Sequence, residues 1–257
     1  GDINIYKTNT FDLLLDRTIS FVHGIASITQ NIGETQNKGF EFSISSVNIN
    51  RGDFTWKTMA NASFVSNKIV SLYGELDQSG QEIDDIANQW FIGHPINVNF
   101  NYKWAGVWQE SEASEASAYG QQPGFVKVED LNNDGVINAD DRQIIGQVDP
   151  KFLWGLTNTI TYKNFTLNIF MHGVHGVTKE NPLKNDHALA EVRNNVTYKN
   201  WWTPENPNTG WLVNHYDAQM QGGVTVPYFE NASFVRVKDV SFAYSIPEAV
   251  LAKIGFG

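Results

Sequence analysis

The chain has 257 residues, of which 41% are hydrophobic and 18% charged; this suits one large or two smaller folded domains and excludes bulk disorder. The formal net charge of −10 argues against a nucleic-acid-binding surface, and the absence of cysteine excludes disulfides and thiolate metal sites. Aromatic residues make up 13%, which favours a sugar-binding surface or the aromatic girdles of a membrane barrel. No stretch approaches the roughly 18 consecutive apolar residues of a transmembrane helix, but the strands of a barrel alternate and need no such stretch.

In chain order, several segments alternate apolar and polar residues with the period of two that is typical of β-strands. They are residues 39–46, 54–64, 151–162, 165–172 and 239–244. In the first, Phe40, Phe42 and Ile44 lie on one side and Glu41 and Ser43 on the other. The segment lengths approach the roughly 9–11 residues that a tilted strand needs to cross a membrane.

The connections between these segments alternate between short and long. Short links suited to hairpins are residues 48–53 and 163–164. Long connections are, approximately, residues 10–36, 69–150 and 176–231. This alternation places all long loops on one side, as in an outer-membrane barrel with short periplasmic turns and long extracellular loops. Residues 92–108 are strand-like and are expected to form a hairpin of their own inside a long outer loop.

Alternation by itself leaves a membrane barrel and a soluble β-sandwich equally favoured, because half-buried sandwich strands alternate in the same way. Trp154 and Tyr162 lie at opposite ends of one apolar strand face, where interfacial aromatic residues of a barrel belong. This placement and the order of the loops favour the barrel. We therefore predict an all-β fold: an antiparallel transmembrane β-barrel fragment with long extracellular loops.

Residues 130–141 have the spacing of an EF-hand-type loop, with oxygen-bearing side chains at positions 1, 3, 5, 9 and 12 and Gly135 at position 6. Calcium takes about six to eight oxygen ligands, so the backbone must wrap around the ion, and a glycine permits the sharp turn. The predicted ligands of a structural Ca²⁺ are Asp130, Asn132, Asp134, the carbonyl of Val136, Asn138 and Asp141. Asp141 replaces the glutamate of helical EF-hands, as in dockerin-type loops. The alternative is a solvated turn without an ion.

The residues that could be catalytic form no recognisable constellation. His172 and His175 point different ways in a strand, and the carboxylate pairs Asp84-Asp85 and Asp140-Asp141 are expected in solvated loops. The sequence contains no nucleophile elbow, P-loop or dinucleotide fingerprint. We therefore predict that the chain is not an enzyme.

The predicted outer loops are rich in tryptophan, which could stack on sugar rings, pack against a partner protein or pack the loops' own small cores. These residues are Trp104, Trp108, Trp201, Trp202 and Trp211. The small, acidic and polar residues of 109–118 are expected to form a mobile loop surface.

A series of short segments extends in order over almost the whole chain. They are Tyr6-Lys7, Asp12-Leu13-Leu14, Asn31-Ile32-Gly33, Asn37-Lys38-Gly39-Phe40-Glu41, Gly93-His94-Pro95-Ile96, Ala105-Gly106-Val107-Trp108-Gln109, Asp141-Arg142-Gln143-Ile144-Ile145-Gly146, Pro150-Lys151-Phe152, Gly155-Leu156, Trp202-Thr203-Pro204-Glu205-Asn206-Pro207, residues 232–240 and Tyr244-Ser245-Ile246-Pro247. In order and spacing they resemble the C-terminal third of the SusC/RagA-type TonB-dependent outer-membrane transporters of Bacteroidetes. Residues 1–257 would then be an incomplete C-terminal part of such a barrel, and the loop at 130–141 would lie within an extracellular loop.

The resemblance implies a many-stranded barrel with an internal plug, located in the outer membrane of a Gram-negative bacterium. It also implies import of oligosaccharides or oligopeptides, with a SusD-like surface lipoprotein as partner and energy supplied through TonB. No residues match the family's N-terminal plug or TonB-contacting segment, and the chain is expected to be a fragment at both ends. Strand faces with Glu41, Lys57, Asn61 and Asn168 are expected to line the lumen. Faces with Trp56, Phe64, Trp154, Leu167 and Phe242 are expected to meet membrane lipid.

The rival hypothesis is a secreted, calcium-stabilised β-rich protein that binds carbohydrate through exposed tryptophans. It predicts a chain that is soluble without detergent and has sugar affinity of its own. The transporter hypothesis predicts a protein that needs detergent or lipid.

Overall fold

The computed structural model describes residues 1–18, 27–182, 184 and 199–251. The chain divides into two units. The first consists of Gly1–Ile96, Asp149–Val177 and Ser233–Gly257. The second consists of Asn97–Val148 and Thr178–Ala232. Each unit is described by itself below.

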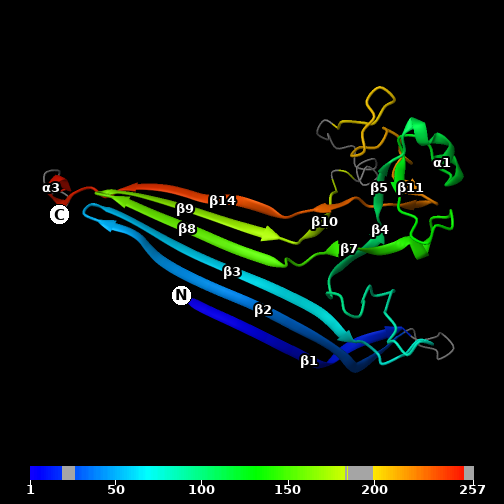
Figure 1. Cartoon of the computed structure of the whole chain (residues 1–257), viewed down its shortest axis with the longest axis horizontal. Coiled ribbons are helices and arrows are strands. Elements are labelled where there is room, and N and C mark those ends of the chain that lie inside the picture. The colour runs from blue at the N-terminus through cyan, green and yellow to red at the C-terminus, as the bar shows by residue number, and fades with distance from the viewer. Residues whose placement is uncertain (19–26, 183, 185–198, 252–257) are drawn as a thin grey trace. The chain divides into compact units, whose positions relative to one another are not determined.

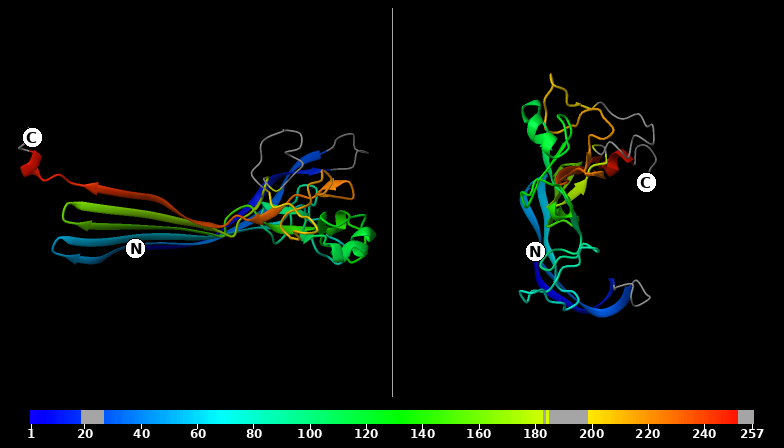
Figure 2. Two further views of the ribbon diagram at one scale, coloured as in Figure 1. Left: turned by 90° about the horizontal axis from the view of Figure 1, so that it is seen from above. Right: turned by 90° about the vertical axis from the view of Figure 1, so that its right-hand side faces the viewer.

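The first unit contains a six-stranded antiparallel sheet in the order β1-β2-β3-β8-β9-β14 (Figure 1). The strands are β1 (Asp2–Thr18), β2 (Ser27–Arg51), β3 (Phe54–Ser71), β8 (Phe152–Tyr162), β9 (Phe165–His175) and β14 (Phe234–Tyr244). They form a single layer when seen from above (Figure 2). A short helix, α3 (Glu248–Leu251), follows β14. The structure confirms the predicted all-β antiparallel fold. It extends four of the five predicted strand segments, and the fifth, residues 151–162, corresponds to β8 without its first residue.

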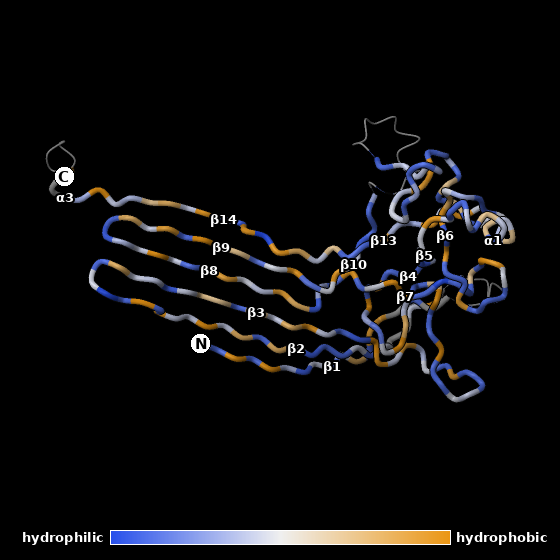
Figure 3. The backbone as a smooth tube through the Cα atoms, turned by 45° about the horizontal axis from the view of Figure 1, so that its top comes forward, coloured by the Kyte–Doolittle hydropathy of each residue, from blue (hydrophilic) through white to orange (hydrophobic). Residues whose placement is uncertain are grey.

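The strand register separates apolar and polar side chains onto opposite faces of this sheet. Phe40 lies opposite Phe64, which lies opposite Phe152 on the next strand. Glu41, one residue along from Phe40, lies opposite Ser63. We call these sides the apolar face and the polar face. The apolar face carries Ile3, Ile5, Phe40, Phe42, Phe64, Phe152, Trp154, Leu167 and Phe242 in matching rows. The resulting alternation of hydrophobic and hydrophilic residues along the strands is visible in Figure 3.

Both short links are present, and the one at residues 163–164 has its predicted bounds, whereas the one predicted at residues 48–53 is shorter because β2 continues to Arg51. Between β2 and β3 the chain turns at Gly52-Asp53, where Gly52 has a φ of 53°. Between β8 and β9 it turns at Lys163-Asn164, with Lys163 at a φ of 52°. Residues with positive φ match the twist of tight hairpins.

The predicted long connection at residues 10–36 was wrong. Most of this range belongs to strands, because β1 continues to Thr18 and β2 begins at Ser27. The remaining residues, 19–26, lie outside the described residues. The two strands stay paired across register shifts between Thr10 and Leu14. Backbone pairing tolerates such bulges, but each one interrupts the period of two that predicts a strand from sequence.

The second unit contains short paired strands. Its pairs are β4 (Val98–Tyr102) with β7 (Arg142–Gln147), β5 (Trp104–Val107) with β6 (Val126–Val128), β10 (Thr178–Glu180) with β13 (Phe229–Asn231), and β11 (Met220–Gln221) with β12 (Val224–Thr225). The prediction that residues 92–108 form a hairpin of their own was therefore wrong, because β4 and β5 each pair with a strand from later in the chain. Helical turns are η2 (Glu110–Glu112), α1 (Ala113–Ala118) and η3 (Ala139–Asp141).

A small hydrophobic core holds the second unit together. Its buried members are Val107, Trp108, Ala116, Phe125, Val126, Val128, Trp202, Leu212, Ala218 and Val226. The fully buried Gln219 satisfies its amide by donating from Nε2 to the carbonyl of Val226 at 2.9 Å. Buried polar groups need such partners, and this bond joins the two ends of the β11–β12 hairpin, which the two residues flank. Over the described ranges, helices are all too short or too polar to cross a membrane.

Candidate functional site

The loop at residues 130–141 joins β6 to β7 through the 3₁₀ turn η3. It is thus flanked by strands rather than by the two helices of a helical EF-hand. Gly135 has a φ of 80°, so the sharp turn expected at position 6 of the loop is present. A Cβ at this position would meet no atom within 4 Å, so the need for glycine is conformational rather than steric.

The predicted ligand side chains organise the backbone of the loop. Asp130 accepts hydrogen bonds from the N–H of Asn133 at 2.7 Å and from the N–H of Gly135 at 3.0 Å. Asn132 accepts from the N–H of Asp134 at 3.0 Å, and Asp134 accepts from the N–H of Val136 at 2.8 Å. Successive Asx turns therefore fold this part of the loop back on itself.

Asp141 closes the loop. Its side chain is fully buried, and its two oxygens accept from the N–H of Leu131 at 2.9 Å and the N–H of Asn138 at 2.8 Å. Asn138 also caps η3 by accepting from the N–H of Asp140 at 2.8 Å. The last predicted ligand thus joins the first and last parts of the loop.

The donor set suits a hard cation, because it consists of carboxylate, amide and carbonyl oxygens. Each carboxylate oxygen that accepts one backbone N–H keeps acceptor capacity for a second partner. Within the described part of the chain, however, no three side chains of Asp, Glu, His or Cys are gathered as a metal site. The structure therefore shows a preformed turn of suitable composition, and calcium binding stays a prediction.

Asp130 also contacts a residue that sequence spacing did not indicate. The hydroxyl of Tyr119, just after α1, donates to Asp130 Oδ2 at 3.0 Å. Burial raises the pKa of Asp130, but hydrogen bonds from Gly135, Tyr119 and Asn133 outweigh it and hold the pKa below its usual range. The same contact with the carboxylate raises the pKa of Tyr119. The loop is thereby tied to α1 in a way that keeps Asp130 ionised.

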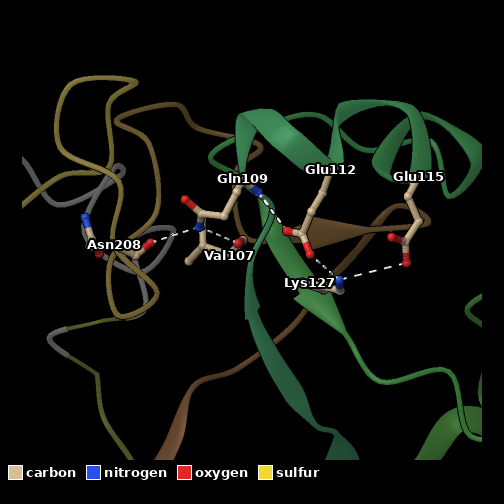
Figure 4. A network of polar contacts seen from close by, with 6 residues as sticks. All are labelled: Val107, Gln109, Glu112, Glu115, Lys127 and Asn208. Carbon is tan, nitrogen blue, oxygen red and sulfur yellow. Dashed lines mark hydrogen bonds and ion pairs between the residues drawn. The ribbon is translucent and has the colours of Figure 1, made fainter.

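The segment at residues 109–118 is folded, so its prediction as a mobile loop surface was wrong. Figure 4 shows Lys127 between two glutamates of this segment: its Nζ lies 2.8 Å from Glu112 Oε1 and 3.9 Å from Glu115 Oε1. Glu112 also accepts from the N–H of Gln109 at 3.0 Å. Ala116 is fully buried in the core, so this small residue permits close packing of α1, whereas Ala113, Ser117 and Ala118 are exposed.

Three of the five loop tryptophans pack the core of the second unit. Trp108 and Trp202 are each 3% exposed, and Trp104 packs against the same cluster. Trp202 Nε1 donates to Gln109 Oε1 at 3.0 Å, and Trp104 Nε1 donates to the carbonyl of Val226 at 3.1 Å. For these three residues the alternative of packing the loops' own core is confirmed. Trp201 and Trp211 remain partly exposed.

The polar face of the sheet carries a shallow groove of about 580 Å³. Its walls are two rows of residues that run across neighbouring strands. One row is Asn4, Glu41, Ser63 and Leu153, and the other is Asp2, Ser43, Asn61, Gly155 and His172. His172 and His175 lie on opposite faces of β9, as predicted, so they do not form a metal pair. His175 instead accepts from Trp154 Nε1 at 3.1 Å on the apolar face.

Comparisons with known proteins identify the kind of protein to which these two faces belong. No family model matches the chain. TonB-dependent receptor P3 of Formosa agariphila is 34% identical over 97% of this chain and 26% of its own length. TonB-dependent receptor SusC of Bacteroides thetaiotaomicron is 28% identical over 95% of this chain and 24% of its own length. The solved structure of the RagAB peptide importer in its open-open state superimposes with a TM-score of 0.68 at 20% identity, over 97% of this chain and 26% of that chain.

The sheet with one apolar and one polar face is therefore a portion of a TonB-dependent receptor β-barrel. The chain belongs to the SusC/RagA-type family of these receptors, which confirms the resemblance. It spans about a quarter of the length of the relatives it matches.

Proposed function

We propose that this chain forms barrel wall and outer loops of an outer-membrane receptor that imports nutrients with energy supplied through TonB. The observation that carries this proposal is the exposed apolar face of the single-layer sheet. Ile3, Ile5 and Phe242 are 73%, 76% and 68% exposed. Leaving such a side chain in water rather than burying it costs about 1.5–3 kcal/mol. A whole face of them requires an apolar cover, and lipid supplies it in a barrel.

Polar atoms in the middle of the apolar face support this assignment. Asn158 Oδ1 accepts from Trp56 Nε1 at 2.9 Å and from Thr58 Oγ1 at 2.7 Å. In hydrocarbon no water can satisfy such groups, so they must pair within the protein. The polar face carries Glu41, Lys57, Asn61 and Asn168, which suits a lumen lining.

We further propose that the receptor carries oligosaccharides or oligopeptides and works with a SusD-like surface lipoprotein. SusC and the RagAB peptide importer, to which the chain is similar, support this proposal. The relatives are named as receptors, so we assign a transport rather than a catalytic role. The partly exposed Trp201 and Trp211 are the loop tryptophans still available to meet substrate or partner. The rival hypothesis of a soluble carbohydrate-binding protein has less support, because Trp104, Trp108 and Trp202 serve the core.

We also propose that the loop at 130–141 binds a structural Ca²⁺ through Asp130, Asn132, Asp134, the carbonyl of Val136, Asn138 and Asp141. The Asx turns and the glycine at position 6 support the proposal, as does the oxygen-only donor set. Bound calcium would supply positive charge among three aspartates that repel one another, and so stiffen an outer loop.

The transport proposal is tested with the full-length receptor in its native host. It should fractionate with the outer membrane, need detergent for extraction, and support growth on its substrate only when TonB is present. A full-length protein that is soluble without detergent would contradict the proposal. Growth that does not depend on TonB would contradict the energy coupling.

A further inference from the structure

Two lysines lie directly opposite each other on the apolar face. Lys7 of β1 pairs in register with Lys38 of β2, and Lys68 of β3 lies one row farther along, opposite Gln36. Lys7 belongs to the series that contains Ile5, and Lys38 to the series that contains Phe40, so both project from the lipid-facing side. All three lysine side chains are exposed.

A groove of about 640 Å³ lies at this position. One wall is the row of Ile5, Phe40 and Phe64, and the other is the row of Lys7, Lys38 and Ser66. Tyr6, Gly39 and Val65 form the row between them and supply the backbone floor, since their own side chains project from the polar face. The groove thus has an apolar side and a cationic side.

No carboxylate of the described residues lies within ion-pair distance of Lys7, Lys38 or Lys68. The acidic residue farther along this part of β2 is Glu34, which accepts from Asn9 Nδ2 at 3.3 Å. Like charges directly opposite each other destabilise a sheet. The polar atoms of Asn158 and Thr58 on this face are hydrogen-bonded to each other. The positive charges of the three lysines, in contrast, have no carboxylate partner among the described residues. An anion in the groove would remove this repulsion.

The height of the lysine row on the barrel indicates which anion. From Trp56 to Phe64 the apolar face extends over eight residue-to-residue steps, which is about 26 Å of strand or about 20 Å across a bilayer at the usual tilt. The row of Lys7 and Lys38 comes next, about 5 Å farther toward the long loops. This is the depth at which headgroup phosphates meet acyl chains, and lysines at this level extend toward the interface.

We propose that Lys7 and Lys38, assisted by Lys68, bind the phosphate of a phosphorylated lipid headgroup in the outer leaflet. The lipid's acyl chains would lie over Ile5, Phe40 and Phe64. This inference rests on the proposed function, which places the apolar face in lipid and the long loops outside. It adds a specific lipid site to the barrel wall.

The test uses the full-length receptor, reconstituted in nanodiscs of uncharged phospholipid with a trace of bisphosphorylated lipid A or its phosphate-free counterpart. Native mass spectrometry measures how much of each glycolipid stays bound. The Lys7→Gln/Lys38→Gln variant is compared with Lys57→Gln/Lys238→Gln, which removes the same charge from residues of the polar face or its groove. A Lys7→Arg/Lys38→Arg variant keeps the charge and serves as the check on folding.

The wild type should retain the phosphorylated glycolipid in preference to the phosphate-free form. Lys7→Gln/Lys38→Gln should weaken this retention at least about tenfold, since each lysine near an anionic headgroup contributes a factor of about five. The Lys57/Lys238 control and the arginine variant should behave like the wild type. Equal retention of both glycolipids, or equal loss in the control, would overturn the lipid site. A receptor that inserts and imports normally but shows no phosphate preference would refute this inference alone, whereas a receptor that does not insert would refute the proposed function.

Discussion

Asp141 should be the residue on which the order of the 130–141 loop depends most. Its fully buried carboxylate accepts two backbone hydrogen bonds, from Leu131 and Asn138. Asp141→Ala removes the acceptor of both N–H groups. A hydrogen bond to a charged group contributes about 1.5–3 kcal/mol, so the loss of two such bonds should cost the loop about 3–6 kcal/mol of local stability.

The measurement is hydrogen–deuterium exchange of the full-length receptor in detergent, with a chelator present so that calcium does not contribute. Exchange at Leu131 and Asn138 should accelerate by about 10²–10⁴-fold in Asp141→Ala, up to the limit set by local unfolding. The matched control is Asp140→Ala, whose side chain is exposed. If both variants exchanged alike at these two amides, the loop-closing role of Asp141 would be refuted.

Three further outcomes are expected. Calorimetric titration should show calcium binding by the wild type and at least tenfold weaker binding by Asp130→Ala and Asp134→Ala; equal binding by all three proteins would contradict the calcium site. The hydrogen bond from Lys127 lowers the pKa of Glu112. The stability that this bond gives to the docking of α1 is therefore present above the pKa of Glu112 in the unfolded state, and it is lost as the pH falls through the pKa in the folded state. Exchange at α1, corrected for intrinsic rates, should therefore rise in acid for the wild type, and Glu112→Gln should remove this dependence; an unchanged dependence would refute it. Gly39→Ala places a Cβ against the ring of Tyr6, which covers this glycine. Urea unfolding in micelles should therefore show that the free energy of unfolding falls by about 1–3 kcal/mol, and that Tyr6→Ala in the same chain restores it.

The strands could be predicted from the sequence wherever the period of two is uninterrupted. Phe40 to Ile44 and the stretch from Phe54 to Phe64 have this property, and both lie in long strands. Most of β1 and the start of β2 could not be predicted, because they are rich in Asn, Thr and Gln and contain register shifts. Backbone hydrogen bonds to the neighbouring strand maintain these parts, and such bonds leave no trace in hydropathy.

The candidate loop was predictable for a different reason. Calcium-type loops need particular residues at fixed local spacing, so Gly135 and the Asx turns can be anticipated from one segment. The contact of Tyr119 with Asp130 and the pairing of Lys7 with Lys38 could not be, because both depend on how separate segments meet. The burial of Trp108 and Trp202 likewise depends on distant chain segments that form one core.

The central claim is that one face of the six-stranded sheet meets lipid and the other meets water. Spin labels at Ala60→Cys and Asn61→Cys test it directly, since these neighbours on β3 belong to opposite faces and the chain itself contains no cysteine. The labels would be placed in the full-length receptor in a lipid bilayer, with any other cysteine replaced. The account predicts that the label at position 60 is relaxed mainly by oxygen dissolved in lipid and that at position 61 mainly by a water-soluble nickel complex. Equal access of the nickel complex to both positions, or the reverse order, would contradict it.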